Sequence, residues 1–109
     1  MPGARRAVQA ALAVAPDDPR ATYNLGVVAQ REGRYNEARE AYLHTLQRDA
    51  RSYAARYNLA VLTKDAGVVG EARHHLEALL RQYPGDRAAV QLLAQLEHVD
   101  QAPTGGMQR

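Results

Sequence analysis

The stretch ATYNLGVVAQREGRYNEAREAYLHTL at residues 21–46 is matched by a second stretch, ARYNLAVLTKDAGVVGEARHHLEALL, at residues 55–80. Ten residues of the first stretch recur in the second at one constant spacing, the distance along the chain from Ala21 to Ala55, which is called here the repeat length. The pairs are Ala21/Ala55, Tyr23/Tyr57, Asn24/Asn58, Leu25/Leu59, Val27/Val61, Gly33/Gly67, Glu37/Glu71, Ala38/Ala72, Arg39/Arg73 and Leu46/Leu80. A repeat of this length is one supersecondary unit that cannot bury its apolar face alone. We therefore expect such units to stack side by side into a solenoid.

Apolar residues at helical spacing predict six helices and no strands. The expected ranges are residues 4–15, 19–32, 36–48, 53–66, 69–82 and 87–99. The boundaries carry N-cap side chains at Asp18, Ser52 and Asp86, and glycine at Gly33 and Gly67, where a helix has to end. The tail at residues 100–109 lacks this periodicity and is predicted to be disordered.

Composition excludes several classes of function. The 109 residues carry a formal net charge of +2, which is too small for a dedicated nucleic-acid-binding protein. There is no cysteine, so disulfides, thiolate catalysis and zinc–thiolate sites are excluded. No apolar run is long enough to cross a membrane. The histidines lack metal-binding spacing: His44, His74, His75 and His98. We therefore expect no metal, no cofactor, no catalytic residues and a cytoplasmic location.

The residues around the two glycine turns resemble the tetratricopeptide repeat. The shared features are the Asn-Leu-small segments at 24–26 and 58–60, the glycine turns, the Glu-Ala pairs that open the second helices, and Pro84. The chain departs from the family pattern at Ala50, where proline is usual. It also departs from it at four positions where aromatic residues are common: Thr22, Ala29, Arg56 and Thr63. The resemblance covers about residues 4–98 and implies an all-α, right-handed superhelix of antiparallel helix pairs.

The register of the repeat divides the chain into parts. Leu12 stands one repeat length before Leu46, so residues 4–15 look like the second helix of a half repeat. Residues 19–52 and 53–86 are full repeats, and residues 87–99 resemble a capping helix, so that one domain spans residues 1–99. Small residues are expected where paired helices approach closely: Gly26, Ala38, Ala60, Ala72 and Ala94.

In this family the first helices of successive repeats line a concave groove. One side of those helices carries the candidate binding residues, given about 100° per residue: Arg20, Tyr23, Asn24, Val27, Gln30 and Arg31; Tyr57, Asn58, Val61, Lys64 and Asp65; Gln91, Leu92 and Gln95. An asparagine amide offers a donor and acceptors to an extended peptide, and tyrosine adds contact area with a polar tip. Asn24 and Asn58 are equally open to interpretation as scaffold residues.

The sequence therefore predicts a non-catalytic scaffold that binds an extended peptide or partner segment in its groove. Three first helices about 9 Å apart leave room for about six extended residues, with an affinity near micromolar. Some family members clamp the terminal carboxylate of heat-shock chaperones with basic residues. No such clamp is expected here, because its basic positions fall on Ala54, Asn58, Ala88 and Leu92.

The opening half repeat leaves a second interpretation open. Val8, Leu12 and their neighbours lack a mate in the sequence, and exposed apolar surface often marks an interface. Three explanations compete: the chain is part of a longer protein, the helix turns its alanine face onto the next helix, or the terminus pairs with a second copy. The alternative function is therefore self-association through the half-repeat ends, giving a homo-oligomer.

Overall fold

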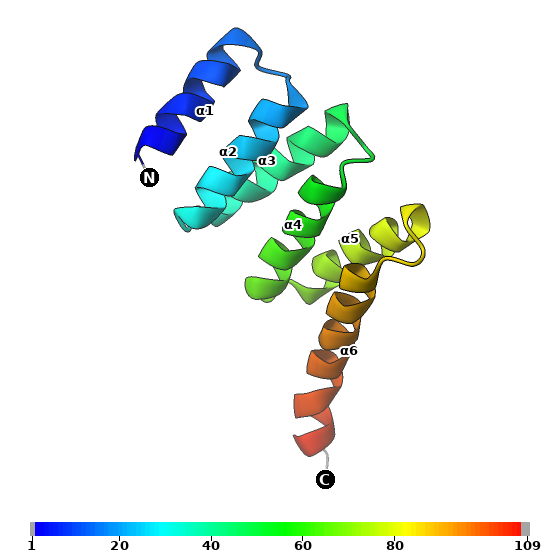
Figure 1. The fold of residues 1–109 in the computed structure, drawn as a ribbon. Coiled ribbons are helices and arrows are strands. Elements are labelled where there is room, and N and C mark those ends of the chain that lie inside the picture. The colour runs from blue at the N-terminus through cyan, green and yellow to red at the C-terminus, as the bar shows by residue number, and fades with distance from the viewer. Residues whose placement is uncertain (1, 108–109) are drawn as a thin grey trace.

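The computed structural model describes the backbone of residues 2–107 and the side chains of residues 3–97. Within that range there are helices and turns but no strand: α1 (Pro2–Val14), α2 (Pro19–Arg31), α3 (Tyr35–Arg48), α4 (Tyr53–Asp65), α5 (Val69–Gln82) and α6 (Arg87–Met107). The helices lie in chain order, each running against its predecessor (Figure 1). The most extensive contacts join α2 to α3 and α4 to α5. The prediction of an all-α solenoid of helix pairs is confirmed.

The helix boundaries form where capping residues stand. Each predicted N-cap accepts a hydrogen bond from a backbone N–H of the first turn: Asp18 from Arg20 (2.9 Å), Ser52 from Ala55 (3.2 Å) and Asp86 from Ala89 (2.8 Å). Gly33 and Gly67 lie in the turns within the two hairpins, with φ angles of +77° and +84°. Glycine adopts this left-handed conformation without the steric cost of a Cβ, so both turns are specified locally.

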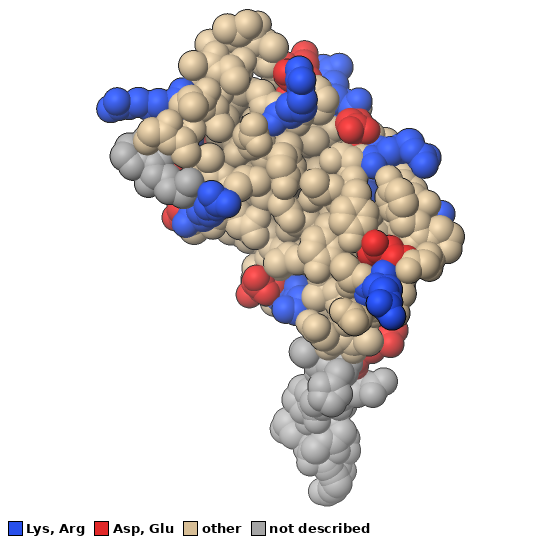
Figure 2. Space-filling model, viewed as in Figure 1, with Lys and Arg blue, Asp and Glu red and all other residues tan. Residues whose placement is uncertain are grey.

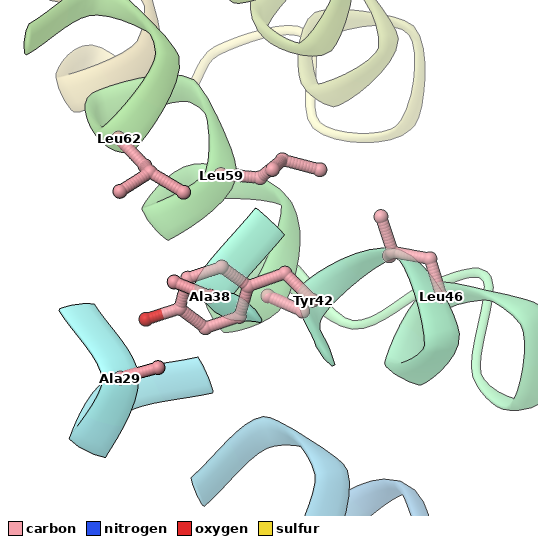
Figure 3. Packing of buried hydrophobic residues seen from close by; sticks show 7 residues of the cluster. Ala29, Ala38, Tyr42, Leu46, Leu59 and Leu62 are labelled. Carbon is pink, nitrogen blue, oxygen red and sulfur yellow. The ribbon is translucent and has the colours of Figure 1, made fainter. Parts of the chain in front are cut away.

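Two apolar clusters hold the stack together. The first surrounds the fully buried ring of Tyr42 between α2, α3 and α4 (Figure 3). The second, between α4, α5 and α6, contains Leu76, which stands one repeat length after Tyr42. The Tyr42 ring is larger than the Leu76 side chain, and it faces Gly26, which has no side chain. A Cβ on Gly26 would lie 2.5 Å from Tyr42 Cε1, so only glycine leaves room for the ring. In the second cluster Ala60 stands at the place of Gly26. At this contact the first hairpin combines a large residue with glycine, and the second combines a smaller leucine with alanine.

Helix α6 differs from the prediction in its buried face and its length. Leu92, expected in the groove, is 7% exposed and packs in the second cluster with Leu96. Ala94, expected at a close helix approach, is exposed because α6 is the last helix described and its packing is against α5. The helix continues to Met107, past the predicted end at Val99. The disorder expected for residues 100–109 stays a prediction, since their side chains, like that of His98, lie outside the described residues.

Helix α1 packs on α2 and buries more than expected. Val8 is 7% exposed, so the prediction that it is under-covered is wrong. Val8 is the buried residue of this helix, whereas Ala7, Ala10, Ala11 and Ala13 are exposed, so the explanation in which the helix turns its alanine face onto the next helix is wrong. Leu12 is half-buried. Self-association through this helix therefore cannot rely on Val8.

Ion pairs fix the register between successive second helices. Arg39 Nε lies 3.0 Å from Glu71 Oε2, which joins α3 to α5. Arg5, which occupies the place of Arg39 one repeat earlier, lies 2.8 Å from Glu37 Oε1, and 2.7 Å from Glu32 Oε1. Helix α1 is therefore placed against α3 as α3 is placed against α5.

The α4–α5 hairpin buries polar atoms that the α2–α3 hairpin lacks. The His75 ring is 4% exposed; its Nε2 lies 3.2 Å from Glu71 Oε2, and its Nδ1 has no hydrogen-bond partner. Arg56 Nε is likewise buried without a partner. Burial lowers the pKa of His75, and this effect outweighs the opposing attraction of the Glu71 carboxylate. The folded chain therefore holds His75 neutral more strongly than the unfolded chain does.

The contact between Gly26 and Tyr42 predicts a large effect of one methyl group. Gly26→Ala should lower the free energy of unfolding by about 1–3 kcal/mol, since the added Cβ overpacks the ring. Gly70→Ala is the matched control, because this glycine also lies in a helix and its Cβ would meet nothing within 4 Å. That variant should be unchanged or slightly more stable. Urea denaturation of both variants measures the difference, and equal changes would contradict the packing argument.

The buried imidazole predicts a loss of stability in mild acid. The free energy of unfolding should fall as the pH drops below about 6.5, because the unfolded chain binds a proton that His75 excludes when folded. The slope attributable to one such group is at most about 1.4 kcal/mol per pH unit. His75→Ala, which copies Ala41 of the preceding hairpin, should flatten the slope, whereas His74→Ala at the exposed neighbour should keep it. Urea titrations between about pH 7.5 and 5 test this, and an unchanged slope in His75→Ala would count against it.

Candidate functional site

The first helices of the repeats, α2, α4 and α6, form one face of the molecule, called here the α2–α4–α6 face. Figure 2, viewed as in Figure 1, shows mostly uncharged atoms over the middle of this face and charged residues mainly around its margin. The candidate residues lie on these three helices. Those that are half-buried are Tyr23, Val27, Gln30, Tyr57, Asn58, Val61 and Lys64; those that are exposed are Arg20, Asn24, Arg31, Asp65, Gln91 and Gln95.

Several of these polar residues are already bonded within the chain. Asn58 Nδ2 of α4 donates a hydrogen bond to Tyr23 Oη of α2 (3.0 Å). The Tyr23 ring lies 5.8 Å from the Tyr42 ring, and Tyr42 Oη donates to Gln30 Oε1 (2.6 Å). Burial raises the pKa of Tyr42 to about 12, so it remains a hydroxyl donor. Asn58, Tyr23 and Gln30 therefore connect α2, α3 and α4, which favours the scaffold interpretation for Asn58.

A second tyrosine group covers the junction of α4 and α5. The rings of Tyr53 and Tyr57 are stacked at 5.8 Å, and Tyr83 meets Tyr53 edge-on at 5.6 Å. Tyr53 Oη donates to Asp86 Oδ2 (2.8 Å), the carboxylate that caps α6. Burial and the neighbouring Asp86 carboxylate raise the pKa of Tyr53 to about 12. Tyr57 therefore rests on a fixed aromatic support and presents a defined surface.

An open hollow of about 370 Å³ lies where the N-terminal ends of α2 and α4 meet the C-terminal end of α3. It is lined by Pro19, Arg20, Tyr23, Asn24, Thr45, Asp49, Ser52 and Ala54. The Asn24 side chain is exposed at this hollow and makes no hydrogen bond with the described residues. Its donor and its acceptor are therefore available to a ligand, in contrast to the amide of Asn58.

Sequence reasoning found part of this hollow. Arg20, Tyr23 and Asn24 were predicted from the periodicity of one helix. Thr45 and Asp49 were missed because they come from the end of a second helix, on the far side of a turn. No single-helix pattern signals such a junction. The repeat itself indicates such a junction, since equivalent helix ends must meet at each step of a stack.

Arg20, Lys64 and Asp65 are engaged locally, whereas the exposed Arg31 makes no ion pair with the described residues. Arg20 Nη2 lies 3.3 Å from Asp18 Oδ2, and Lys64 Nζ lies 3.3 Å from Asp65 Oδ1. Both arrangements are exposed, so they contribute little to stability. They leave Arg31, in the last turn of α2, as the cation among the candidates that no described carboxylate pairs. Among the described residues, no group of three or more histidine, cysteine or acidic side chains is placed to hold a metal ion. None of the helices, where described, is long and apolar enough to span a bilayer.

Comparison with known proteins gives the same family twice. Sequence profiles of the tetratricopeptide repeat match residues 29–96 and residues 2–50. A peroxisomal targeting signal receptor from Eremothecium gossypii (strain ATCC 10895) is 37% identical over 82 residues, which cover 75% of this chain and 14% of the receptor. The chain thus spans about one seventh of that relative.

A solved structure shares the fold. The second tetratricopeptide domain of human RPAP3, determined by NMR in complex with the HSP70 peptide SGPTIEEVD, superposes with a TM-score of 0.74 at 19% identity. The match covers 83% of this chain and 75% of that domain. At this identity the likeness concerns the arrangement of helices.

The different surroundings of the two asparagines predict different effects on stability. Asn58→Ala removes the hydrogen bond to Tyr23 and should lower the free energy of unfolding by about 0.5–1.5 kcal/mol. Asn24→Ala removes an exposed side chain without an internal partner and should change it by less than about 0.5 kcal/mol. Urea denaturation of the two variants provides the comparison. Equal losses would show that Asn24 is also part of the scaffold.

Proposed function

Because the chain belongs to the tetratricopeptide repeat family, a family of protein-interaction folds, we propose that it is a non-catalytic scaffold whose α2–α4–α6 face binds an extended segment of a partner protein. The observation that carries this proposal is the free amide of Asn24 beside the open hollow. An amide placed there can bond the backbone of an extended segment while the hollow receives one of its side chains.

The chemistry of the face favours an uncharged segment. The centre of the face carries tyrosine, asparagine and valine, and the nearby Arg20 and Lys64 are paired with carboxylates. The unpaired Arg31 lies at the C-terminal end of α2, so an acidic side chain placed at the centre would lose its hydration without gaining a cation. We therefore infer that the partner segment has neutral side chains where it crosses α2 and α4.

The two relatives suggest the kind of ligand but not its sequence. The RPAP3 domain is described with an HSP70 peptide that ends in Glu-Val-Asp, and the other relative is named for a targeting signal. Here the positions that would supply a basic carboxylate clamp are Ala54, Asn58, Ala88 and Leu92. None is basic, and Leu92 packs in the second cluster. A chaperone C-terminus is therefore a poor ligand for this chain, whereas peptide binding as such is retained in the proposal.

Peptide selection tests the proposal directly. A random nonapeptide library should yield binders with dissociation constants near micromolar, given the small contact that such a segment makes. Asn24→Ala removes the amide and Ala54→Trp fills the hollow, so each should weaken these binders about tenfold, or about 1.4 kcal/mol. Isothermal titration calorimetry measures the change.

The control and the contrary outcomes are specific. Asn36→Ala alters an exposed asparagine on α3, away from the α2–α4–α6 face, and should leave affinity unchanged. The peptide SGPTIEEVD should bind at least tenfold more weakly than the selected neutral peptides. Peptide binding that falls steeply with salt would instead show that charged side chains of the segment dominate, which would contradict the neutral segment inferred here. Selected peptides that ignore Asn24→Ala and Ala54→Trp alike would rule out this face.

A further inference from the structure

The open hollow of the first hairpin has a filled equivalent in the second. One repeat length after each residue that lines the hollow stands a residue of the junction between α4, α5 and α6. The pairs are Pro19/Tyr53, Arg20/Ala54, Tyr23/Tyr57, Asn24/Asn58, Thr45/Leu79, Asp49/Tyr83, Ser52/Asp86 and Ala54/Ala88. In two of these pairs tyrosine replaces a residue without an aromatic ring, at Tyr53 and at Tyr83. The hollow is therefore open at the place where the second hairpin carries two rings.

The two additional rings make defined contacts in the second hairpin. Tyr53 stacks on Tyr57 with an angle of 7° between the ring planes, and Tyr83 meets Tyr53 edge-on. Tyr53 Oη donates to the Asp86 carboxylate, and Tyr83 Oη donates to the backbone oxygen of Arg51 (3.1 Å). Both rings pack against the second apolar cluster. The second hairpin thus shows which kind of side chain fits this place and how it is held.

The backbones of the two hairpins agree at the places from which these rings project. Pro19 and Tyr53 are each the first residue of their helix, and the N-cap residues before them have φ angles of −68° and −65°. Asp49 and Tyr83 each follow the last residue of their helix, with φ angles of −140° and −133° and ψ angles of 84° and 75°. The hollow therefore results from the side chains of Pro19 and Asp49 and not from a different course of the chain.

The first hairpin keeps the aromatic support on which such a ring would rest. Tyr23, at the place of Tyr57, lines the hollow. Its ring lies 5.8 Å from the Tyr42 ring, and its hydroxyl accepts the hydrogen bond from Asn58. An aromatic side chain that enters the hollow can therefore stack on Tyr23 as Tyr53 stacks on Tyr57. Aromatic pairs of this kind stabilise by more than the area that they bury.

The hollow also offers polar partners for a phenol hydroxyl. Ser52 Oγ, at the place of Asp86, accepts the backbone N–H of Ala55, and its own proton bonds none of the described residues. The Asp49 carboxylate is exposed and accepts one long hydrogen bond, from the backbone N–H of Arg51 (3.3 Å). A carboxylate has acceptor sites beyond this one. A phenol can thus donate to Asp49 or accept from Ser52, whereas a phenylalanine ring would leave both unused.

We propose that the hollow binds a tyrosine side chain of the partner segment, with its ring stacked on Tyr23 and its hydroxyl beside Ser52 and Asp49. This rests on the proposed function and names the residue that anchors the bound segment. The hollow of about 370 Å³ lies within the range of ligand pockets, roughly 300–1,000 Å³. Tyrosine is uncharged, in keeping with the chemistry of the face. The partner ring supplies in the first repeat the contact that Tyr53 makes in the second.

A graft of the two rings tests the hollow without any ligand. The filled variant, Pro19→Tyr with Asp49→Tyr, carries the residues of the second hairpin at both places. Its matched control is the alanine variant, Pro19→Ala with Asp49→Ala, which removes the same side chains and adds no ring. The filled variant should unfold at a higher urea concentration than the alanine variant, and it should bind the selected peptides at least about tenfold more weakly. Equal urea midpoints, or equal affinities, would overturn the proposal.

The selected peptides provide the second test. Nonapeptides that depend on Asn24 should share a tyrosine at one position. In isothermal titration calorimetry, phenylalanine at that position should weaken binding several-fold, and alanine at least about tenfold. In Ala54→Trp, where the hollow is blocked, both replacements should have little effect. Peptides that lose affinity in Asn24→Ala yet carry no aromatic residue would overturn the tyrosine proposal and leave the proposed function standing.

A small probe, N-acetyltyrosinamide, distinguishes failure of this proposal from failure of the proposed function. At about 10 mM, where millimolar binding is populated, it should shift the backbone amide resonances of Tyr23, Asn24 and Ser52 in NMR spectra. N-acetylalaninamide should not shift them, and the filled variant should respond to neither probe. A peptide library without binders contradicts the proposed function. An absence of shifts at these three residues with N-acetyltyrosinamide overturns the tyrosine proposal, whatever the library yields.

Discussion

The close approach of the two helices within each hairpin is the constraint on which the rest of the structure depends. At that contact Gly26 receives the ring of Tyr42, and in the next repeat Ala60 shares a cluster with Leu76. Both solutions fill the same space, one with a ring against no side chain and the other with an isobutyl group against a methyl group. Interiors tolerate such exchanges when the total volume is kept. The spacing of the two helices within each hairpin follows from this filling.

The repeat made most of the fold predictable. Caps at Asp18 and Ser52 and left-handed glycines at Gly33 and Gly67 are local signals, and local chemistry was sufficient to place them. The outer parts of the chain were harder, because periodicity identifies an apolar side but not the neighbour that covers it. Periodicity assigns Leu92 to the groove by its equivalence to Asn58, yet as an apolar residue it packs in the second cluster, against which Tyr57 also lies. Periodicity predicts that Val8 is exposed, because its helix lacks a mate in the sequence, but the packing of α1 on α2 covers it.

The candidate site, too, is predicted from the sequence only in part. Helical periodicity grouped Tyr23, Asn24 and Asn58 on one side, but it treated the two asparagines alike. The structure separates them, because Asn58 has a tyrosine of the preceding repeat within 3.0 Å, whereas the described helix before Asn24 is α1, which corresponds to a second helix. Equivalent residues at successive positions of a solenoid therefore have different partners near its ends. A sequence repeat cannot express this difference, since it records identity and not the presence of a neighbour.

The hydrogen bond from Asn58 to Tyr23 would link the proposed binding of a segment to the geometry of the stack. It crosses from one repeat to the next on the α2–α4–α6 face, while the Arg39–Glu71 pair makes the corresponding link between the second helices. A segment lying over α2 and α4 would add a third link between the same two repeats. Repeat arrays derive their cooperativity from such nearest-neighbour terms, and a ligand that binds only the folded array stabilises it by mass action. Since α2 and α4 belong to two successive hairpins, a segment bound across them would stabilise both hairpins and not one alone.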